Sequence, residues 1–175
     1  MPNTFTLIAS STVGSGGAAN IDFTSIPSTY TDLVLKCSIR GSRSNAVDSI
    51  AIYFNNDTTS GRYPARMLYG TGSSATSYTT NTNYNDEYAY ISGNSSTSNT
   101  FGNTEFYIPN YAGSTQKSVS IDSVGENNAT TAFMSLTAFL YNQTTAISRI
   151  TLVPYYGSST ILQYSTAYLY GIVKS

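Results

Sequence analysis

Histidine and tryptophan are absent from this sequence of 175 residues, and cysteine occurs once, at Cys37. Without histidine, the chain cannot build a Ser-His-Asp triad, a Cys-His pair or a histidine-based metal site. A single cysteine excludes an intramolecular disulfide and, with histidine missing, removes the usual ligands of structural zinc. Because Cys37 lies in the apolar run LVLKCSI, we predict a buried thiol that packs as a small hydrophobic side chain. We expect no metal and no cofactor.

Charged residues are also scarce. They make up 10% of the chain, and eight basic residues stand against nine acidic ones, which leaves a net charge of −1. This balance offers a polyanion little to bind, so nucleic acid is not an expected partner. The N-terminal stretch MPNTFTLIASSTVGSGG has neither a basic region nor a long apolar run. We therefore expect no signal peptide and no membrane insertion, and predict synthesis in a cytosol.

Serine, threonine, asparagine and tyrosine take the place of the missing charges, and tyrosine alone occurs 16 times. Disordered chains are poor in aromatic and β-branched residues, whereas this one is rich in both. A length of 175 residues suits a single domain with a packed core. We predict one all-β domain over residues 1–175, with a neutral, hydroxyl-covered surface.

Apolar and polar residues alternate at period two in many short segments bounded by turn-forming residues, which predicts about ten strands. No segment repeats apolar residues at the helical period for long enough to predict a helix. The run TAFMSLTAFLY also contains good helix formers, but its Phe and Thr residues favour a strand. The predicted strands are Thr4–Ile8, Asn20–Ile26, Asp32–Arg40, Ser49–Phe54, Ala65–Tyr69, Asn103–Ile108, Lys117–Val124, Thr131–Tyr141, Ile147–Tyr155 and Ala167–Val173.

Short strands joined by polar turns, without a repeated unit, predict a β-sandwich with jelly-roll-like topology. In such folds the two chain ends often share a sheet, so the last strand can be fully paired. That strand is apolar on both faces: Ala167 and Leu169 lie on one, Tyr168 and Tyr170 on the other. We predict that the first face packs in the core and that Tyr168 and Tyr170 contact a loop or a neighbouring subunit.

The segment Thr71–Gly102 differs from the rest, because it mixes Ser, Thr, Asn, Gly and Tyr with one short strand-like piece, Tyr88–Ser92. Long connections inside a domain are usually functional or flexible. We interpret it as an insertion that projects from the sandwich. Two interpretations of its tyrosines stay open: they form an adaptable binding surface, or they cover strands or line a subunit contact. These tyrosines are Tyr78, Tyr84, Tyr88 and Tyr90.

Two polar clusters invite chemical hypotheses. Asp86 and Glu87 are adjacent, so in a strand they would point to opposite faces, which disfavours a glycosidase pair. The turn with Asn55, Asn56 and Asp57 offers oxygen ligands for calcium, but it lacks the several carboxylates that the ion usually requires. A hairpin turn whose side chains bond their own backbone is the preferred interpretation. We predict that the protein is not an enzyme and has no catalytic residues.

Three stretches resemble a pattern found in virion proteins of tailed bacteriophages, marine and cyanobacterial phages in particular. They are IDFTSIPSTYTDLVLKCSIRGS (Ile21–Ser42), IAIYFNNDT (Ile50–Thr58) and ISRITLVPYYGSSTILQYSTAYLYGI (Ile147–Ile172). In that pattern an Ile-Pro turn precedes a Tyr-Thr-x-Leu strand, and a Ser-x-Ala-x-Leu-Tyr-Gly-Ile strand closes the protein. The motifs mark strands and turns, carry no catalytic residue and do not extend over Thr71–Gly102.

The resemblance implies a virion surface component, either a capsid decoration protein or a β-sandwich unit of a tail fibre or knob. Its implied partners are other virion proteins and further copies of itself in a homo-oligomer, for which a trimer is one option. Its implied location is the virion surface, after assembly in the host cytoplasm. The alternative function is a receptor-binding or glycan-binding module of a tail fibre, with a host surface glycan as its ligand.

Overall fold

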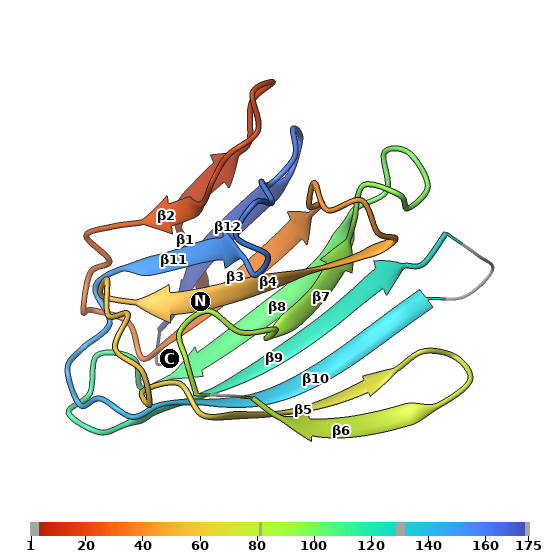
Figure 1. The fold of residues 1–175 in the computed structure, drawn as a ribbon. Helices are drawn as coiled ribbons and strands as arrows, with labels where there is room; N and C mark the ends of the chain where they lie inside the picture. The colour runs from red at the N-terminus through yellow and green to blue at the C-terminus, as the bar shows by residue number, and fades with distance from the viewer. Residues whose placement is uncertain (1–3, 81, 129–131, 174–175) are drawn as a thin grey trace.

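The structure, a computed structural model, describes residues 4–80, 82–128 and 132–173. These residues form twelve β-strands and no α-helix (Figure 1). The strands are β1 Phe5–Thr12, β2 Ile21–Phe23, β3 Asp32–Ile39, β4 Val47–Phe54, β5 Ala65–Gly70, β6 Ala75–Thr79, β7 Ala89–Ser92, β8 Gly102–Pro109, β9 Lys117–Glu126, β10 Ala132–Tyr141, β11 Ile150–Pro154 and β12 Thr166–Ile172.

Two antiparallel sheets pack face to face. The large sheet has eight strands in the order β1-β12-β3-β8-β9-β10-β5-β6, and the small sheet has four in the order β2-β11-β4-β7. In Figure 1 the small sheet lies across part of the large one, so the large sheet extends beyond it at β5 and β6. The predicted all-β sandwich is confirmed. The strand order does not confirm the jelly-roll-like topology.

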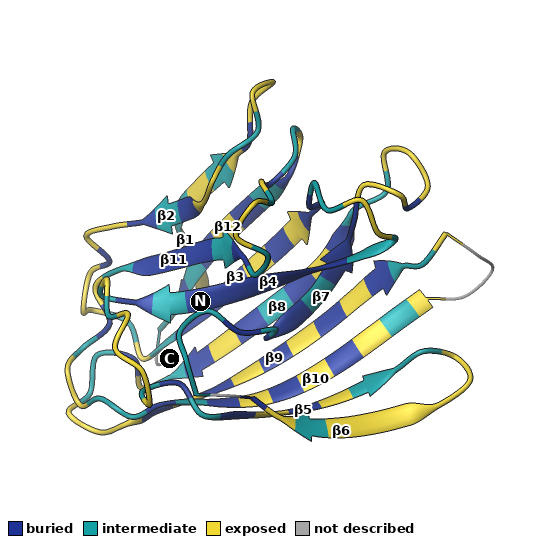
Figure 2. Ribbon diagram, viewed as in Figure 1, coloured by how far each residue is buried: buried dark blue, intermediate teal, exposed yellow. Residues whose placement is uncertain are grey.

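Alternation along the strands of the large sheet separates an inner face from an outer one. In β9 and β10, buried and more exposed residues follow each other along most of the strand (Figure 2). Successive side chains of a strand point to opposite faces, so the buried set faces the small sheet. The predicted start of the β10 segment, Thr131, lies outside the described residues, and the rest of that segment is a strand, as predicted.

Large apolar side chains fill the space between the sheets. Burial raises the pKa of Cys37, which lies among them as predicted. Fully buried members from both sheets include Leu33, Leu35, Ile50, Ile52, Phe54, Phe106, Ile150, Leu152, Ala167 and Leu169.

At one place the two layers approach so closely that only glycine fits. A Cβ atom on Gly102 of β8 would lie 2.8 Å from the Cα of Ile91 in β7. That distance is shorter than real Cβ contacts, so the missing side chain lets β7 rest directly on the backbone of β8.

The last strand is an interior strand of the large sheet. β12 pairs with β1 on one side and with β3 on the other, and Leu169 lies opposite Ala9 and Leu35. Ala167 and Leu169 are fully buried, which confirms the predicted core face. β1 therefore pairs along the side of β12 that would otherwise be an edge, so β12 is paired on both sides although it is the last strand.

The predicted insertion over residues 71–102 is wrong in one respect, because most of this segment does not project from the sandwich. Its first part forms β6, the edge strand next to β5, and its later part forms β7, the edge strand next to β4. The segment thus contributes a strand to each sheet. Residue 81, within it, is not described.

Candidate functional site

Tyr88 lies in the core. Its side chain is fully buried, its ring centroid is 4.9 Å from that of Phe139, and its hydroxyl donates to the backbone oxygen of Tyr63 at 3.1 Å. Burial raises the pKa of this hydroxyl. With its ring enclosed and its polar end satisfied, Tyr88 holds the segment before β7 against the large sheet and offers no surface to a ligand.

The other three tyrosines of this segment are half-buried and have different neighbours. Tyr78 donates to the backbone oxygen of Glu87 at 3.2 Å. Tyr84 meets the ring of Tyr53 edge-on with 5.3 Å between centroids, and Tyr90 meets the ring of Tyr69 at 5.5 Å. The rings of Tyr84 and Tyr90 lie against β4 and β5, and the structure does not gather the three tyrosines into one exposed aromatic patch.

Tyr168 and Tyr170 point to the outer face of the large sheet. Tyr168 is 39% exposed, and Tyr170 is half-buried because Phe5 of the neighbouring β1 leans against its ring at 6.4 Å. Together with Leu7, they form an apolar surface at the β1 edge, which we call the β1–β12 patch (Phe5, Leu7, Tyr168 and Tyr170).

The carboxylates considered for catalysis have structural neighbours. Asp86 is buried and accepts a hydrogen bond from the backbone N–H of Glu87 at 2.7 Å. Glu87 accepts from the hydroxyls of Tyr156 and Ser49. Hydrogen bonding and burial raise the pKa of Tyr156 to about 12, with desolvation as the larger cause. These contacts tie the segment before β7 to β4 and to the loop after β11.

The turn after β4 is not the predicted hairpin, because it leads from the small sheet to β5 in the large sheet and the Asn55 side chain bonds the distant segment 146–149. Asn55 and Asn56 have positive φ angles of 54° and 56°, which asparagine tolerates. The Asn55 side chain accepts from the backbone N–H of Ser148 at 2.9 Å, and Asp57 forms an ion pair with Arg62. Partial burial opposes ionisation of Asp57, but hydrogen bonds from Arg62, Thr59 and Tyr141 outweigh it and lower the pKa.

Large apolar side chains stand exposed along the outer face of the large sheet. From the sequence, we expected an apolar outer face only for the last strand. The same signal, apolar residues on both faces of one strand, is also present in β10. Besides the β1–β12 patch, they include Leu68, Tyr107, Val124, Met134 and Leu136. Contiguous apolar patches on a protein surface usually mark contacts with other molecules.

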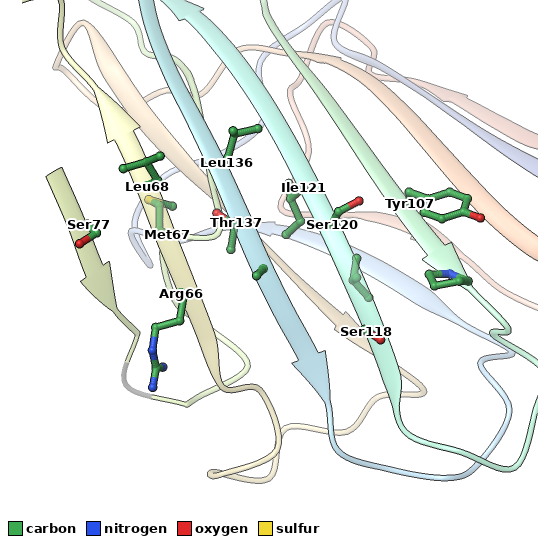
Figure 3. Close-up of a pocket in the computed structure, with 13 residues that line it drawn as sticks. Arg66, Met67, Leu68, Ser77, Tyr107, Ser118, Ser120, Ile121, Leu136 and Thr137 are labelled. Carbon is green, nitrogen blue, oxygen red and sulfur yellow. The ribbon is translucent and has the colours of Figure 1, made fainter. Parts of the chain in front are cut away.

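The centre of this face is hollowed into a groove of about 660 Å³ that spans strands β6, β5, β10, β9 and β8 (Figure 3). Leu68 and Leu136 rise on one side of it, and Tyr107 lies on the other. Among the described residues that line the groove, Arg66 is the only charged one, and five carry hydroxyl groups: Ser77, Tyr107, Ser118, Ser120 and Thr137. We call this the outer groove.

An ion pair separates the outer groove from the β1–β12 patch. Lys36 and Glu105 approach to 2.7 Å on β3 and β8. A hydrogen bond with Glu105 and its charge raise the pKa of Lys36. Both side chains are about half exposed, so the pair contributes little to stability. Next to it, the Tyr107 hydroxyl donates to Asp32 at 3.0 Å.

Among residues 4–80, 82–128 and 132–173 there is no group of three or more Cys, Asp or Glu side chains placed to hold a metal ion. None of the described residues belongs to a helix long and apolar enough to span a membrane.

By fold and by this surface, the chain is a two-sheet β-sandwich with an apolar groove on its larger sheet. No protein-family model matches it, and comparison with curated proteins and with solved structures gives no match.

Proposed function

We propose that the chain is a non-enzymatic structural protein of a tailed-phage virion that assembles as a homo-oligomer on the capsid or tail surface. The observation that carries the proposal is the outer face of the large sheet, where an apolar groove and a second apolar patch lie exposed on the two sides of the Lys36–Glu105 ion pair. The phage-like motifs at the chain ends add support from an independent direction.

A second copy of the chain suits this face for reasons of charge. The outer groove has one charged lining residue, Arg66, and the whole chain has a net charge of −1, so two copies repel each other weakly. Symmetric contacts place the same patch on both subunits. A largely apolar face with few charges can meet its own copy while burying little unpaired charge.

Light scattering combined with size-exclusion chromatography tests the assembly. The native protein should elute as an oligomer, and Leu136→Lys should shift it towards the monomer because it places a charge in the outer groove. Thr58→Lys, at an exposed turn away from the large sheet, is the matched control and should leave the oligomer intact. A native monomer at high micromolar concentration that does not bind assembled particles would contradict the proposal.

Tyr170→Ala separates the two apolar surfaces of the face. If subunits meet through the β1–β12 patch, this change should weaken the oligomer more than Leu136→Lys does. If they meet through the outer groove, the order should reverse. In both cases the Tyr170→Ala subunit should stay folded, because the ring packs outside the core.

A further inference from the structure

A second, polar pocket lies at one end of the sandwich, where three loops that are distant in sequence meet. It has a volume of about 430 Å³, within the range of small-ligand sites. The loops are 14–17 after β1, 94–101 between β7 and β8, and 160–164 before β12. Its lining residues include Arg40, Asn94, Asn99, Phe101, Gln163 and Tyr164.

Tyr164 stands out in this pocket because its backbone is strained and its side chain is exposed. It is the third residue of a turn closed by a hydrogen bond from Ser165 N–H to Leu162 O at 3.2 Å, and its φ is +69°. Turns with a positive φ at this position normally use glycine or asparagine. The Tyr164 side chain is 66% exposed, so it adds little to the core. The strained backbone at Tyr164 is not compensated by buried side-chain contacts, and this points to a functional role for the ring.

Arg40 holds the pocket walls in place. Its guanidinium is buried and donates to the backbone oxygens of Asn94, Ser96, Thr97 and Thr100 at 2.7 to 3.0 Å. Its own backbone binds the opposite wall, since its carbonyl accepts from Leu162 N–H at 2.8 Å and its N–H donates to Ser165 Oγ at 3.1 Å. The two walls are therefore pre-organised, which lowers the cost of binding.

The same contacts indicate the charge of the ligand. Arg40 is the only charged residue that lines the pocket, and both terminal nitrogens of its guanidinium already donate to carbonyls. What remains for a ligand is amide groups from Asn94, Asn99 and Gln163, several hydroxyls, and the rings of Tyr164 and Phe101. Amides and hydroxyls next to a flat ring with a polar tip match a polyhydroxylated ring compound.

We propose that this pocket binds a neutral saccharide, with the ring of Tyr164 as the stacking platform and the amides as hydrogen-bonding partners. The inference is independent of the assembly role, because the pocket lies on loops and shares no residue with the outer groove or the β1–β12 patch. None of Tyr78, Tyr84, Tyr88 and Tyr90, the tyrosines proposed from the sequence as a binding surface, lines this pocket.

Saturation-transfer NMR tests the pocket with methyl glycosides of neutral hexoses and N-acetylhexosamines, their disaccharides, and glucuronate as an anionic comparison, all at millimolar concentration. We expect transfer to the ring protons of at least one neutral sugar and weaker transfer to glucuronate. Tyr164→Gly should weaken binding on the order of tenfold, a typical effect of losing one ring contact. Tyr164→Phe should keep binding, and Thr58→Lys, at an exposed turn that does not line this pocket, should not change it.

The thermal midpoint of Tyr164→Gly separates a binding role from a structural one. Because glycine adopts the positive φ without strain, the midpoint should be equal to that of the native protein or higher. No transfer to any neutral sugar, equal transfer with Tyr164→Gly, or preference for glucuronate would overturn the proposal. A chain that assembles but binds no sugar would reject this inference and leave the assembly proposal standing.

Discussion

Two buried cations, Lys117 and Arg40, are stabilised by hydrogen bonds to backbone carbonyls, and among the described residues no carboxylate forms an ion pair with either. Lys117 donates its Nζ to the carbonyls of Gly113, Thr115 and Thr144, and Arg40 binds the carbonyls of the 94–100 loop. Desolvation lowers the pKa of Lys117. In a chain with few charges, each cation thus organises one loop by collecting carbonyls that no strand satisfies.

Replacing Arg40 by lysine should loosen the 94–100 loop. Lysine keeps the charge but cannot present the planar fork that reaches four carbonyls, so several buried acceptors lose their donor. We expect a loss of about 2 to 4 kcal/mol in the free energy of unfolding. Urea denaturation measures it, and hydrogen exchange should quicken in residues 94–100. Arg66→Lys, at the exposed outer face, is the control, and an equal effect of both changes would contradict this role.

Asp48 is a buried carboxylate that stands out among the acidic residues. Its oxygens accept from the backbone N–H groups of Ser49 at 2.8 Å and Arg43 at 3.2 Å. Burial is the largest influence and raises its pKa above the ordinary value of 3.8, in spite of these donors. The folded protein therefore binds the Asp48 proton more tightly than the unfolded chain does.

This difference predicts how Asp48→Asn changes stability with pH. As pH rises from about 4 through the raised pKa, the native protein must ionise a buried acid and loses stability, whereas the variant has no proton to release there. The free energy of unfolding of Asp48→Asn, relative to native, should therefore rise across this pH window. Thermal or urea unfolding at several pH values measures the difference. A difference that stays constant or falls with pH would show that the carboxyl is not buried as described.

The two faces of strand β12 differ in how much their side chains contribute to stability. It is paired on both sides, so its inner side chains are enclosed by β1, β3 and the small sheet. Leu169 is fully buried there, while its neighbour Tyr168 is 39% exposed on the outer face. Adjacent residues of one strand thus have very different energetic roles.

Leu169→Ala should cost about 2 to 5 kcal/mol of unfolding free energy, because it removes apolar contacts and leaves a cavity between the sheets. Tyr168→Ala, one position earlier, should change it by less than about 1 kcal/mol in the isolated subunit. Urea denaturation of the two variants measures both values. Similar costs for both variants would contradict the assignment of Leu169 to the core face and Tyr168 to the outer face of β12.

Strong alternation in the sequence was enough to predict most strands of the fold. The predicted segments match β9, β10 and β12 closely, although β10 and β12 carry apolar residues on both faces. β6 was missed because ATSYT has little apolar character, and it becomes a strand only through its pairing with β5. The local sequence pattern cannot reveal a weakly apolar edge strand whose formation depends on pairing with its neighbour.

The sites were harder to predict than the strands, for a physical reason. The residues next to Tyr88 in the sequence are those of a polar surface. Its ring is nevertheless buried, and its hydroxyl is satisfied by a hydrogen bond to the backbone oxygen of Tyr63. The pocket near Tyr164 depends on a positive φ and on three loops brought together by the fold. Neither a backbone angle nor a long-range juxtaposition leaves a mark in local sequence.

At the scale of the whole molecule, scarcity of charge determines how contacts between copies should respond to salt. Apolar contacts are little affected by sodium chloride, whereas contacts between exposed charges weaken as the screening length shortens. If subunits meet through the outer face, their dissociation constant should change by less than about threefold between ~0.05 and ~1 M sodium chloride. Sulfate should tighten the assembly.

Sedimentation equilibrium at these salt concentrations measures the dissociation constant. Weakening by more than about tenfold would indicate that exposed charges, such as Lys36 and Glu105, form the contact between subunits in place of the apolar surfaces. The Leu136→Lys variant is the control, since its residual association should be more sensitive to salt than that of the native protein.

The pairing of β1 with β12 also has a practical consequence. Phe5 lies opposite Ile172, so the first and last described strands meet at one corner of the large sheet. A short linker between the start of β1 and the end of β12 would join these strands without crossing the core. New termini could be placed in an exposed turn such as the one around Gly157, where an added Cβ atom would meet no other part of the protein within 4 Å. Because β1 begins and β12 ends at this corner, polypeptide joined to these two points would leave the large sheet side by side.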